Sequence, residues 1–329
     1  MKSFAAAVAT ALLAGGTAPA LAQPEKSYPD RAVRLVVPWA AGGNIDVLTR
    51  VVAQRLSQVW GQQFVVDNRG GANGMIGSEM VIRSAPDGYT LVVDGLQTHA
   101  INPFIFSTMA YDTQRDLAPI TLMGAVQHIL VAHPALPVKT TRDLVALAKA
   151  RPQEIAYATF GTGSMPHVAG ELFQQLTGVT LLHVPYKGGG PALTGLLSGE
   201  ASIYWPGIAI AIPHIKAGKL RALGVASKDR SEELPELPTL AEQLNAPAYD
   251  VTSVFAFMAP AGTPRPVINK LHAGVTQVLA LAEVRKIYAS LGATSPPPLS
   301  PEETLAMLRA ESIRWGKVVR TANIKSNQP

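Results

Sequence analysis

Two glycine-rich segments contain the residues that could bind a charged group. The first, residues 39–46, holds Gly42 and Gly43, and the second, residues 161–167, holds Gly161 and Gly163. Each segment follows an apolar run that predicts a buried strand and precedes a pattern that predicts an amphipathic helix. The first N–H groups of a helix have no partner within it, so such a loop predicts an anion site. Two such loops favour a protein that holds one carboxylate between two lobes.

The second loop also contains a serine and a histidine that could act as a catalytic pair. Ser164 lies between Gly163 and Met165, so it lacks the second glycine of a nucleophile elbow. His167 follows three residues later, and no third member is evident. We expect Ser164 to cap the helix or to contact a ligand. A hydrolase or transferase that acts on a carboxylate with Ser164 and His167 stays as the alternative.

Neither a cofactor nor a metal ion is expected from the sequence. The spacing from Gly161 through Gly163 to Pro166 lacks the third glycine of a dinucleotide-binding fingerprint. The seven histidines show no metal-binding spacing.

Three residues near the predicted strand ends admit two roles each. Asp46 falls in the first turn of a predicted helix, where a carboxylate complements the helix dipole. This structural role is favoured over a contact with a ligand amine or hydroxyl. Trp39 and Trp205 end predicted strands, where α/β proteins bind ligands. Each is either a core residue or a wall of the cleft, and a wall would suit an aromatic acid.

The N-terminal residues predict export. Lys2 precedes an apolar run at residues 4–13, and the segment ends in Ala20-Leu21-Ala22, so we expect residues 1–22 to be a signal peptide cleaved after Ala22. No later run reaches the roughly 20 apolar residues of a membrane span. The chain has no cysteine, and its net charge of +5, without a basic run, argues against nucleic-acid binding. We therefore expect a periplasmic protein.

Strand and helix patterns alternate along the chain, which predicts an α/β fold. We expect two lobes, each a mixed, mostly parallel sheet flanked by helices. Residues 23–123 and 252–329 would form lobe 1, and residues 124–251 would form lobe 2. The clearest helix patterns lie at 44–60, 75–84 and 208–217, and the second glycine loop follows a predicted strand at 155–159.

An ordered set of motifs resembles the Bug (Bordetella uptake gene product) family, the substrate-binding components of tripartite tricarboxylate transporters. The resemblance covers nearly the whole chain after residue 22. It is carried by residues 28–29, 36–46, 66–72, 85–91, 161–164 with His167, 184–188, 217–223 and 259–264.

The resemblance implies a periplasmic Venus-flytrap fold without catalysis, a monomer that passes a small organic carboxylate to membrane subunits of a transporter. A sensor subunit that presents its ligand to a membrane kinase would use the same closed state. The chain departs from the family pattern at Gly71, Asn73, Ser202 and Pro206. The missing carboxylates at Ser202 and Pro206, beside Tyr204 and Trp205, favour an apolar or aromatic carboxylate over an amino acid. The ligand-binding residues carried over from the family, together with the two tryptophans, are Trp39, Ala41, Gly42, Gly43, Asp46, Gln97, Thr98, Gly161, Thr162, Gly163, Ser164, His167 and Trp205.

Overall fold

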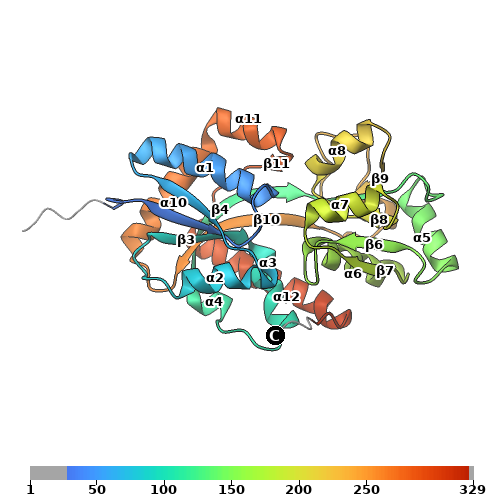
Figure 1. The fold of residues 1–329 in the computed structure, drawn as a ribbon, viewed down its shortest axis with the longest axis horizontal. Coiled ribbons are helices and arrows are strands. Elements are labelled where there is room, and N and C mark those ends of the chain that lie inside the picture. The colour runs from blue at the N-terminus through green and yellow to red at the C-terminus, as the bar shows by residue number, and fades with distance from the viewer. Residues whose placement is uncertain (1–27, 326–329) are drawn as a thin grey trace, which may run out of the picture.

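The computed structural model describes residues 28–325, which form two β-sheets with helices around them. Figure 1 shows the halves side by side, with α1, α10 and α11 around the first sheet and α5 to α8 around the second. The predicted signal peptide and its cleavage site lie outside the described residues. Within residues 28–325, no helix is both long and apolar enough to cross a bilayer.

The first sheet has the strand order β11-β4-β10-β3-β1-β2. Its strands come from two parts of the chain, before and after the second sheet. They are β1 (Val33–Val37), β2 (Phe64–Asn68), β3 (Thr90–Gly95), β4 (Leu117–Gln127), β10 (Thr252–Pro260) and β11 (Ala293–Thr294).

The second sheet has the order β7-β6-β8-β5-β9. Its strands are β5 (Ile129–Ala132), β6 (Ala156–Thr159), β7 (Leu182–Pro185), β8 (Ile203–Tyr204) and β9 (Arg221–Val225). The chain passes from the first sheet to the second between β4 and β5 and returns through β10.

Helices follow most strands. Those of the first half are α1 (Asn44–Trp60), the 3-10 turn η1 (Ala72–Gly74), α2 (Met75–Ile82), α3 (Leu96–Ile105), α4 (Thr113–Asp116), α10 (Arg265–Ala280) and α11 (Ala282–Ser290). Those of the second half are α5 (Thr141–Ala150), α6 (Met165–Thr177), α7 (Gly189–Leu197), α8 (Ile208–Lys216) and α9 (Leu240–Leu244), and the chain closes with α12 (Pro301–Thr321). The predicted helices at 44–60, 75–84 and 208–217 are observed with ends within two residues.

The α/β class and the two mixed sheets are confirmed, but the expected parallel majority is wrong. In the part of the chain that the structure describes, β10 pairs antiparallel with β3 and β4, and β5 pairs antiparallel with β8 and β9. The long strand β10 causes this in the first sheet, because the chain returning from the second half enters with the opposite direction. The parallel pairs remain where the glycine loops emerge, beside β1 and β6.

One apolar cluster joins the halves. It combines Ile101 of α3 and Trp315 of α12 with Tyr157 of β6 and Phe173 of α6. The C-terminal helix contacts both α3 and α6, and Gln175 donates a hydrogen bond of 2.9 Å to the Val318 carbonyl. Helix α12 therefore packs against both halves rather than against one.

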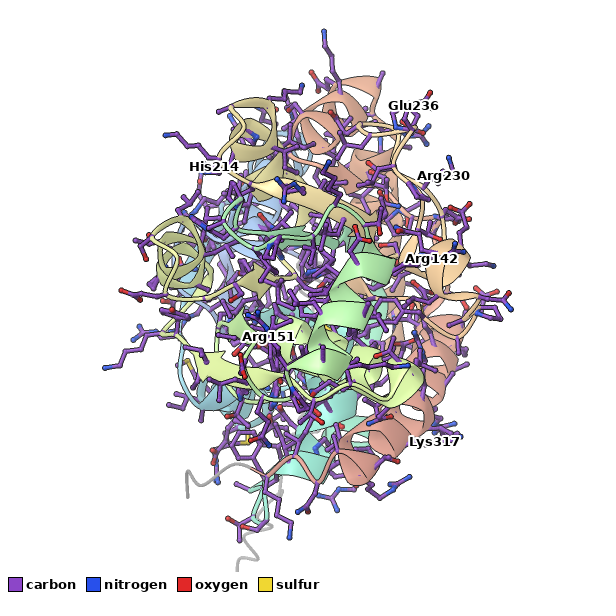
Figure 2. The ribbon with its side chains drawn as sticks, turned by 90° about the vertical axis from the view of Figure 1, so that its right-hand side faces the viewer. Arg142, Arg151, His214, Arg230, Glu236 and Lys317 are labelled. Carbon is purple, nitrogen blue, oxygen red and sulfur yellow. The ribbon has the colours of Figure 1, made fainter. Side chains whose placement is uncertain are left out.

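Charged side chains are spread over the far end of the second half. Figure 2 views this end and shows Arg142, Arg151 and Arg230 well apart from one another. Arg230 pairs with Glu242 at 3.1 Å.

Candidate functional site

The first glycine loop joins β1 to the N-terminus of α1. Its backbone turns at Gly42, where φ is +83°, a conformation that favours glycine. The Gly42 N–H donates to Asp46 Oδ2 at 2.8 Å. Asp46 Oδ1 accepts from Asn68 at 3.0 Å, and Arg50 forms an ion pair with the same oxygen at 2.9 Å. The Asp46 side chain is therefore turned toward its own loop and helix.

The electrostatics of Asp46 match this placement. Burial raises the pKa of Asp46, but hydrogen bonds from Arg50, the Gly42 N–H and Asn68 outweigh it, so the net pKa is lowered. The residue is an ionised carboxylate in the first turn of α1, where the helix dipole favours it. This geometry favours the structural role over direct contact with a ligand.

Trp39 lies half-buried at the start of the same loop. Its indole N–H donates to Asp94 Oδ1 at 2.6 Å. Its ring meets Phe160 of the second loop edge to face, with centroids 6.3 Å apart. Because its N–H already has a partner, Trp39 can offer a ligand only its ring.

Gln97 and Thr98 begin α3 at the end of β3. The Gln97 side-chain oxygen accepts from the Val254 N–H of β10 at 2.9 Å, and Gln97 is buried. Thr98 is half-buried and lies beside Gly74, whose missing Cβ would be 3.3 Å from the Thr98 methyl group. Of these two predicted residues, Thr98 has the more accessible side chain.

The second glycine loop joins β6 to α6, and the N–H groups of Gly161, Gly163 and Ser164 already have partners. Gly161 N–H donates to Thr159 Oγ1 at 3.2 Å, and Gly163 N–H donates to His167 Nδ1 at 3.0 Å. Ser164 donates through both its N–H and its hydroxyl to the Gly161 carbonyl, at 3.2 and 2.6 Å. Among residues 161–164 only the Thr162 N–H lacks such a bond, and the N–H groups of Met165 and His167 in the first turn of α6 have no acceptor either. The loop is thus preorganised by itself, and fewer amides face a ligand than the sequence predicts.

His167 is buried and neutral. Its ring stacks on His183 with centroids 4.0 Å apart, and His183 Nε2 contacts Thr159 Oγ1 at 2.8 Å. Burial, with a smaller effect of His183, lowers the pKa of His167 to about 3, and burial lowers the pKa of His183 to about 4. Nδ1 of His167 is occupied by Gly163, and the Ser164 hydroxyl points to a carbonyl. The two side chains therefore do not form a nucleophile–base pair.

The second loop packs against η1 and α3 of the first half. A Cβ added to Gly163, where φ is +78°, would lie 2.2 Å from Ile105 Cδ1 and 3.2 Å from Asn73 Nδ2. Asn73 is itself held by Asn102, which accepts its side-chain N–H at 2.7 Å. Gly163 belongs to the second half and the other three residues to the first. Phe160, Ile105 and Asn102 were not among the residues predicted for the site.

Trp205 does not form a wall of the cleft in this structure. Its side chain has no exposed surface and packs against Tyr157 and Phe173, with ring centroids 6.0 and 5.7 Å away. In this conformation Trp205 is a core residue, which is the first of the two roles considered for it. Ala41 and Gly43, by contrast, are exposed in the first loop.

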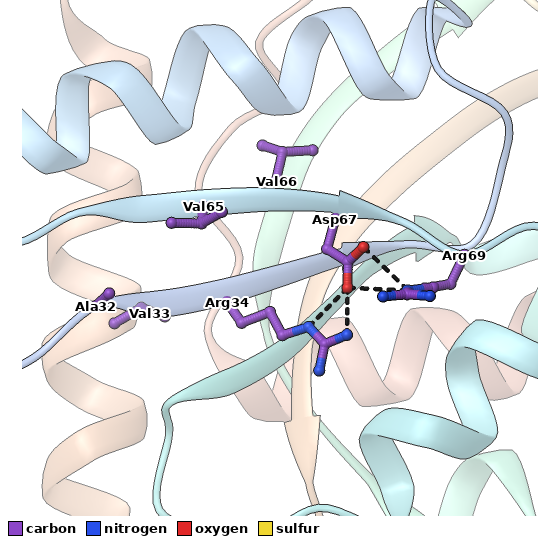
Figure 3. A pocket seen from close by; sticks show the side chains of 7 residues that line it. All are labelled: Ala32, Val33, Arg34, Val65, Val66, Asp67 and Arg69. Atoms are coloured by element: carbon purple, nitrogen blue, oxygen red, sulfur yellow. Dashed lines mark hydrogen bonds and ion pairs between the residues drawn. The ribbon is translucent and has the colours of Figure 1, made fainter.

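A hollow of about 370 Å³ lies elsewhere, against β1 and β2. Figure 3 shows that both Arg34 and Arg69 donate hydrogen bonds to Asp67 in this hollow. The charged side chains that line the hollow are therefore already paired with one another. Within residues 28–325, no three His, Asp or Glu side chains gather as a metal-binding group.

Residues 48–324 match the family model described as "Tripartite tricarboxylate transporter family receptor". The chain belongs to this family. Members are receptors rather than enzymes, which removes the catalytic alternative for Ser164 and His167. The two-sheet architecture is the fold of periplasmic binding proteins.

Individual members are similar over almost their whole length. BugT of Bordetella pertussis is 38% identical over 300 residues, which cover 91% of each chain. The solved structure "R. palustris Rpa4515 with adipate" is 36% identical, with a TM-score of 0.84 over 91% of this chain and 100% of that one. MatC of Rhodopseudomonas palustris with bound malate is 31% identical, with a TM-score of 0.81 over 89% of this chain and 100% of that one. This receptor is therefore a solute-binding protein.

Proposed function

We propose that this receptor captures a small organic carboxylate between its two glycine loops. The observation that carries the proposal is the meeting of the loops, in which Phe160 of the second loop contacts Trp39 of the first with ring centroids 6.3 Å apart. Beside this contact, Gly163 lies against Ile105 and Asn73 of the first half. A ligand placed there would touch both halves only when they are closed, so it would stabilise the closed form. The relatives with adipate and malate support a carboxylate as the ligand class.

The anion would be held mainly by the N-terminus of α1. The N–H groups of Asn44 and Ile45 have no intrahelical acceptor at this position, and the dipole favours negative charge there. Asp46 would keep the loop in shape rather than touch the ligand. From the second loop, Thr162 offers a free N–H, and the Ser164 hydroxyl oxygen can still accept.

The rest of the pocket would be apolar. Trp39 and Phe160 present rings from opposite halves, and the Trp39 N–H is unavailable to a ligand. Such a wall favours the aliphatic or aromatic part of an acid over an amine or a hydroxyl. We therefore place adipate-like and aromatic acids ahead of hydroxy acids.

The division into lobes and the cellular role belong to the same proposal. Lobe 1 would comprise residues 23–123 and 252–329, and lobe 2 residues 124–251. The protein would enter the periplasm after cleavage behind Ala22, act as a monomer, and present its closed form to membrane subunits of a tripartite tricarboxylate transporter. Presentation to a sensor kinase would use the same closed form.

A thermal-shift screen of the refolded mature chain tests the function. Refolding removes any ligand that copurifies, which would otherwise mask the shift. We expect adipate or benzoate to raise the melting temperature, and malate to raise it less at equal concentration. Amines of similar size serve as controls and should have no effect. Failure of every mono-, di- and tricarboxylate to shift the transition would contradict the proposal.

A further inference from the structure

A buried carboxylate lies directly behind Trp39. Asp94 is the second-last residue of strand β3, just before Gly95, and its side chain has no exposed surface. Its Oδ1 accepts hydrogen bonds from the Trp39 indole N–H at 2.6 Å and from the Gly95 N–H at 2.7 Å. Hydrogen bonds to a charged acceptor are shorter and stronger than those between neutral groups. Asp94 therefore ties the first glycine loop to the strand beneath it.

The second oxygen of Asp94 faces a small buried polar group. Oδ2 lies 3.3 Å from His99 Nε2. Apart from this contact, that oxygen and the His99 ring nitrogens have no hydrogen-bond partner among the described residues, and the Tyr111 hydroxyl is buried nearby. Burial and the Asp94 charge raise the pKa of Tyr111, so its phenol stays protonated. Buried polar atoms without hydrogen-bond partners lower the stability of a protein. A buried group of this kind is therefore a candidate for a functional role.

The hydrogen bond from Trp39 to Asp94, called the tie below, restrains the orientation of the Trp39 indole ring. An indole has two side-chain torsions, and a hydrogen bond from its Nε1 to a rigid strand restrains both. The ring then stands edge to face against Phe160, at an interplanar angle of 83°. Trp39 and Phe160 belong to loops of different halves, so their contact exists only while the loops are together.

We propose that Asp94 is a positioning residue of the ligand site. It holds the Trp39 ring in the orientation that meets Phe160 on closure, and so shapes the apolar wall without touching the ligand. The proposal rests on the proposed function for its binding consequence, but the tie itself can be tested without a ligand.

The first readout is the indole N–H resonance of Trp39 in the ¹⁵N-labelled mature chain, assigned by its loss in Trp39→Phe. We expect Asp94→Asn, which keeps an acceptor oxygen but loses the charge, to move this resonance upfield. Asp94→Leu, which removes the acceptor, should move it further. The resonances of Trp60, Trp205 and Trp315 are internal controls. An unmoved Trp39 resonance in Asp94→Asn would overturn the tie, even if Asp94→Leu fails to fold.

The second readout is a double-mutant cycle with adipate and benzoate as probes, measured by calorimetry. Asp94→Leu and Trp39→Phe should each weaken binding about fivefold, and the double variant should be no weaker than the worse single variant. Additive losses would mean that Asp94 does not act through Trp39 and would overturn the proposal. If the wild type binds neither acid, the proposed function is in error, whereas the resonance still decides the tie.

Discussion

At the scale of single residues, His167 shows how the second loop keeps its shape. Its Nδ1 accepts the Gly163 N–H, which requires the neutral ring, and its burial against His183 disfavours the charged form. A protonated ring could no longer accept that N–H. The loop is therefore built for conditions in which His167 is neutral.

This arrangement predicts a pH-dependent stability. The pKa of His167 is about 3 in the folded protein and about 6.5 in the unfolded chain, so the unfolded chain binds the proton first. Stability should fall as the pH drops below about 6.5 and keep falling until about 3. Between pH 7 and pH 5 the loss from this residue is roughly 2 kcal/mol.

The variant His167→Asn isolates that loss, because the Asn oxygen can accept from Gly163 but does not titrate. Urea unfolding at pH 7 and pH 5 should show a smaller loss of stability for the variant than for the wild type. His183 titrates in both proteins and so largely cancels. Equal losses in the two proteins would contradict the role given to His167.

At the scale of elements, α12 is the part that packs against both halves. Trp315 has no exposed surface and lies in the cluster that includes residues of both sheets, whereas Ile313 of the same helix is 75% exposed. Burying a large aromatic side chain stabilises a protein by several kcal/mol, and an exposed aliphatic one contributes little.

We therefore expect Trp315→Ala to lower the free energy of unfolding by about 3–5 kcal/mol. The matched variant Ile313→Ala should change it by less than about 0.5 kcal/mol. Denaturant unfolding followed by far-UV circular dichroism measures both. Similar losses for the two variants would show that α12 does not join the halves as the structure has it.

The elements also show what the sequence could predict. The apolar spacing of Ile45, Leu48, Val52 and Leu56 fixed the helix at 44–60, because local periodicity is enough for an amphipathic helix. The expected lobe boundary at residue 123 falls inside β4, because an unbroken apolar run has no periodicity that indicates where a strand ends. The antiparallel pairing of β4 with β10 joins segments more than a hundred residues apart, which local patterns do not report.

In the candidate site, too, the local features were predicted from the sequence and the long-range contacts were not. Both glycine loops and their strand–loop–helix context were visible, because glycine and helix-start signals are local. The tie from Trp39 to Asp94 spans 55 residues, and the approach of Gly163 to Ile105 depends on how the halves meet. A carboxylate at the end of a buried strand, Asp94, was the local signal that could have predicted a buried polar contact there.

In the whole molecule, the second loop packs against Ile105 of the first half at Gly163, a position without a side chain. Gly163 has Ile105 2.2 Å from its missing Cβ, whereas Gly178 has a similar φ of +69° with no atom within 4 Å. Alanine at either position carries a backbone cost of about 1–2 kcal/mol. Only Gly163→Ala adds a clash between the halves, so the pair separates strain from closure.

If a carboxylate closes the two halves, the distance between them must shorten, and measuring that distance tests closure most directly. Because the chain has no cysteine, Gln58→Cys in α1 and Lys149→Cys in α5 give one clean pair of spin labels, both at exposed positions in opposite halves. We predict that adipate shortens and narrows the distance distribution measured by double electron–electron resonance in the labelled wild type and in Gly178→Ala, and does so much less in Gly163→Ala. An acid that raises the melting temperature but leaves the wild-type distribution unchanged would contradict the account.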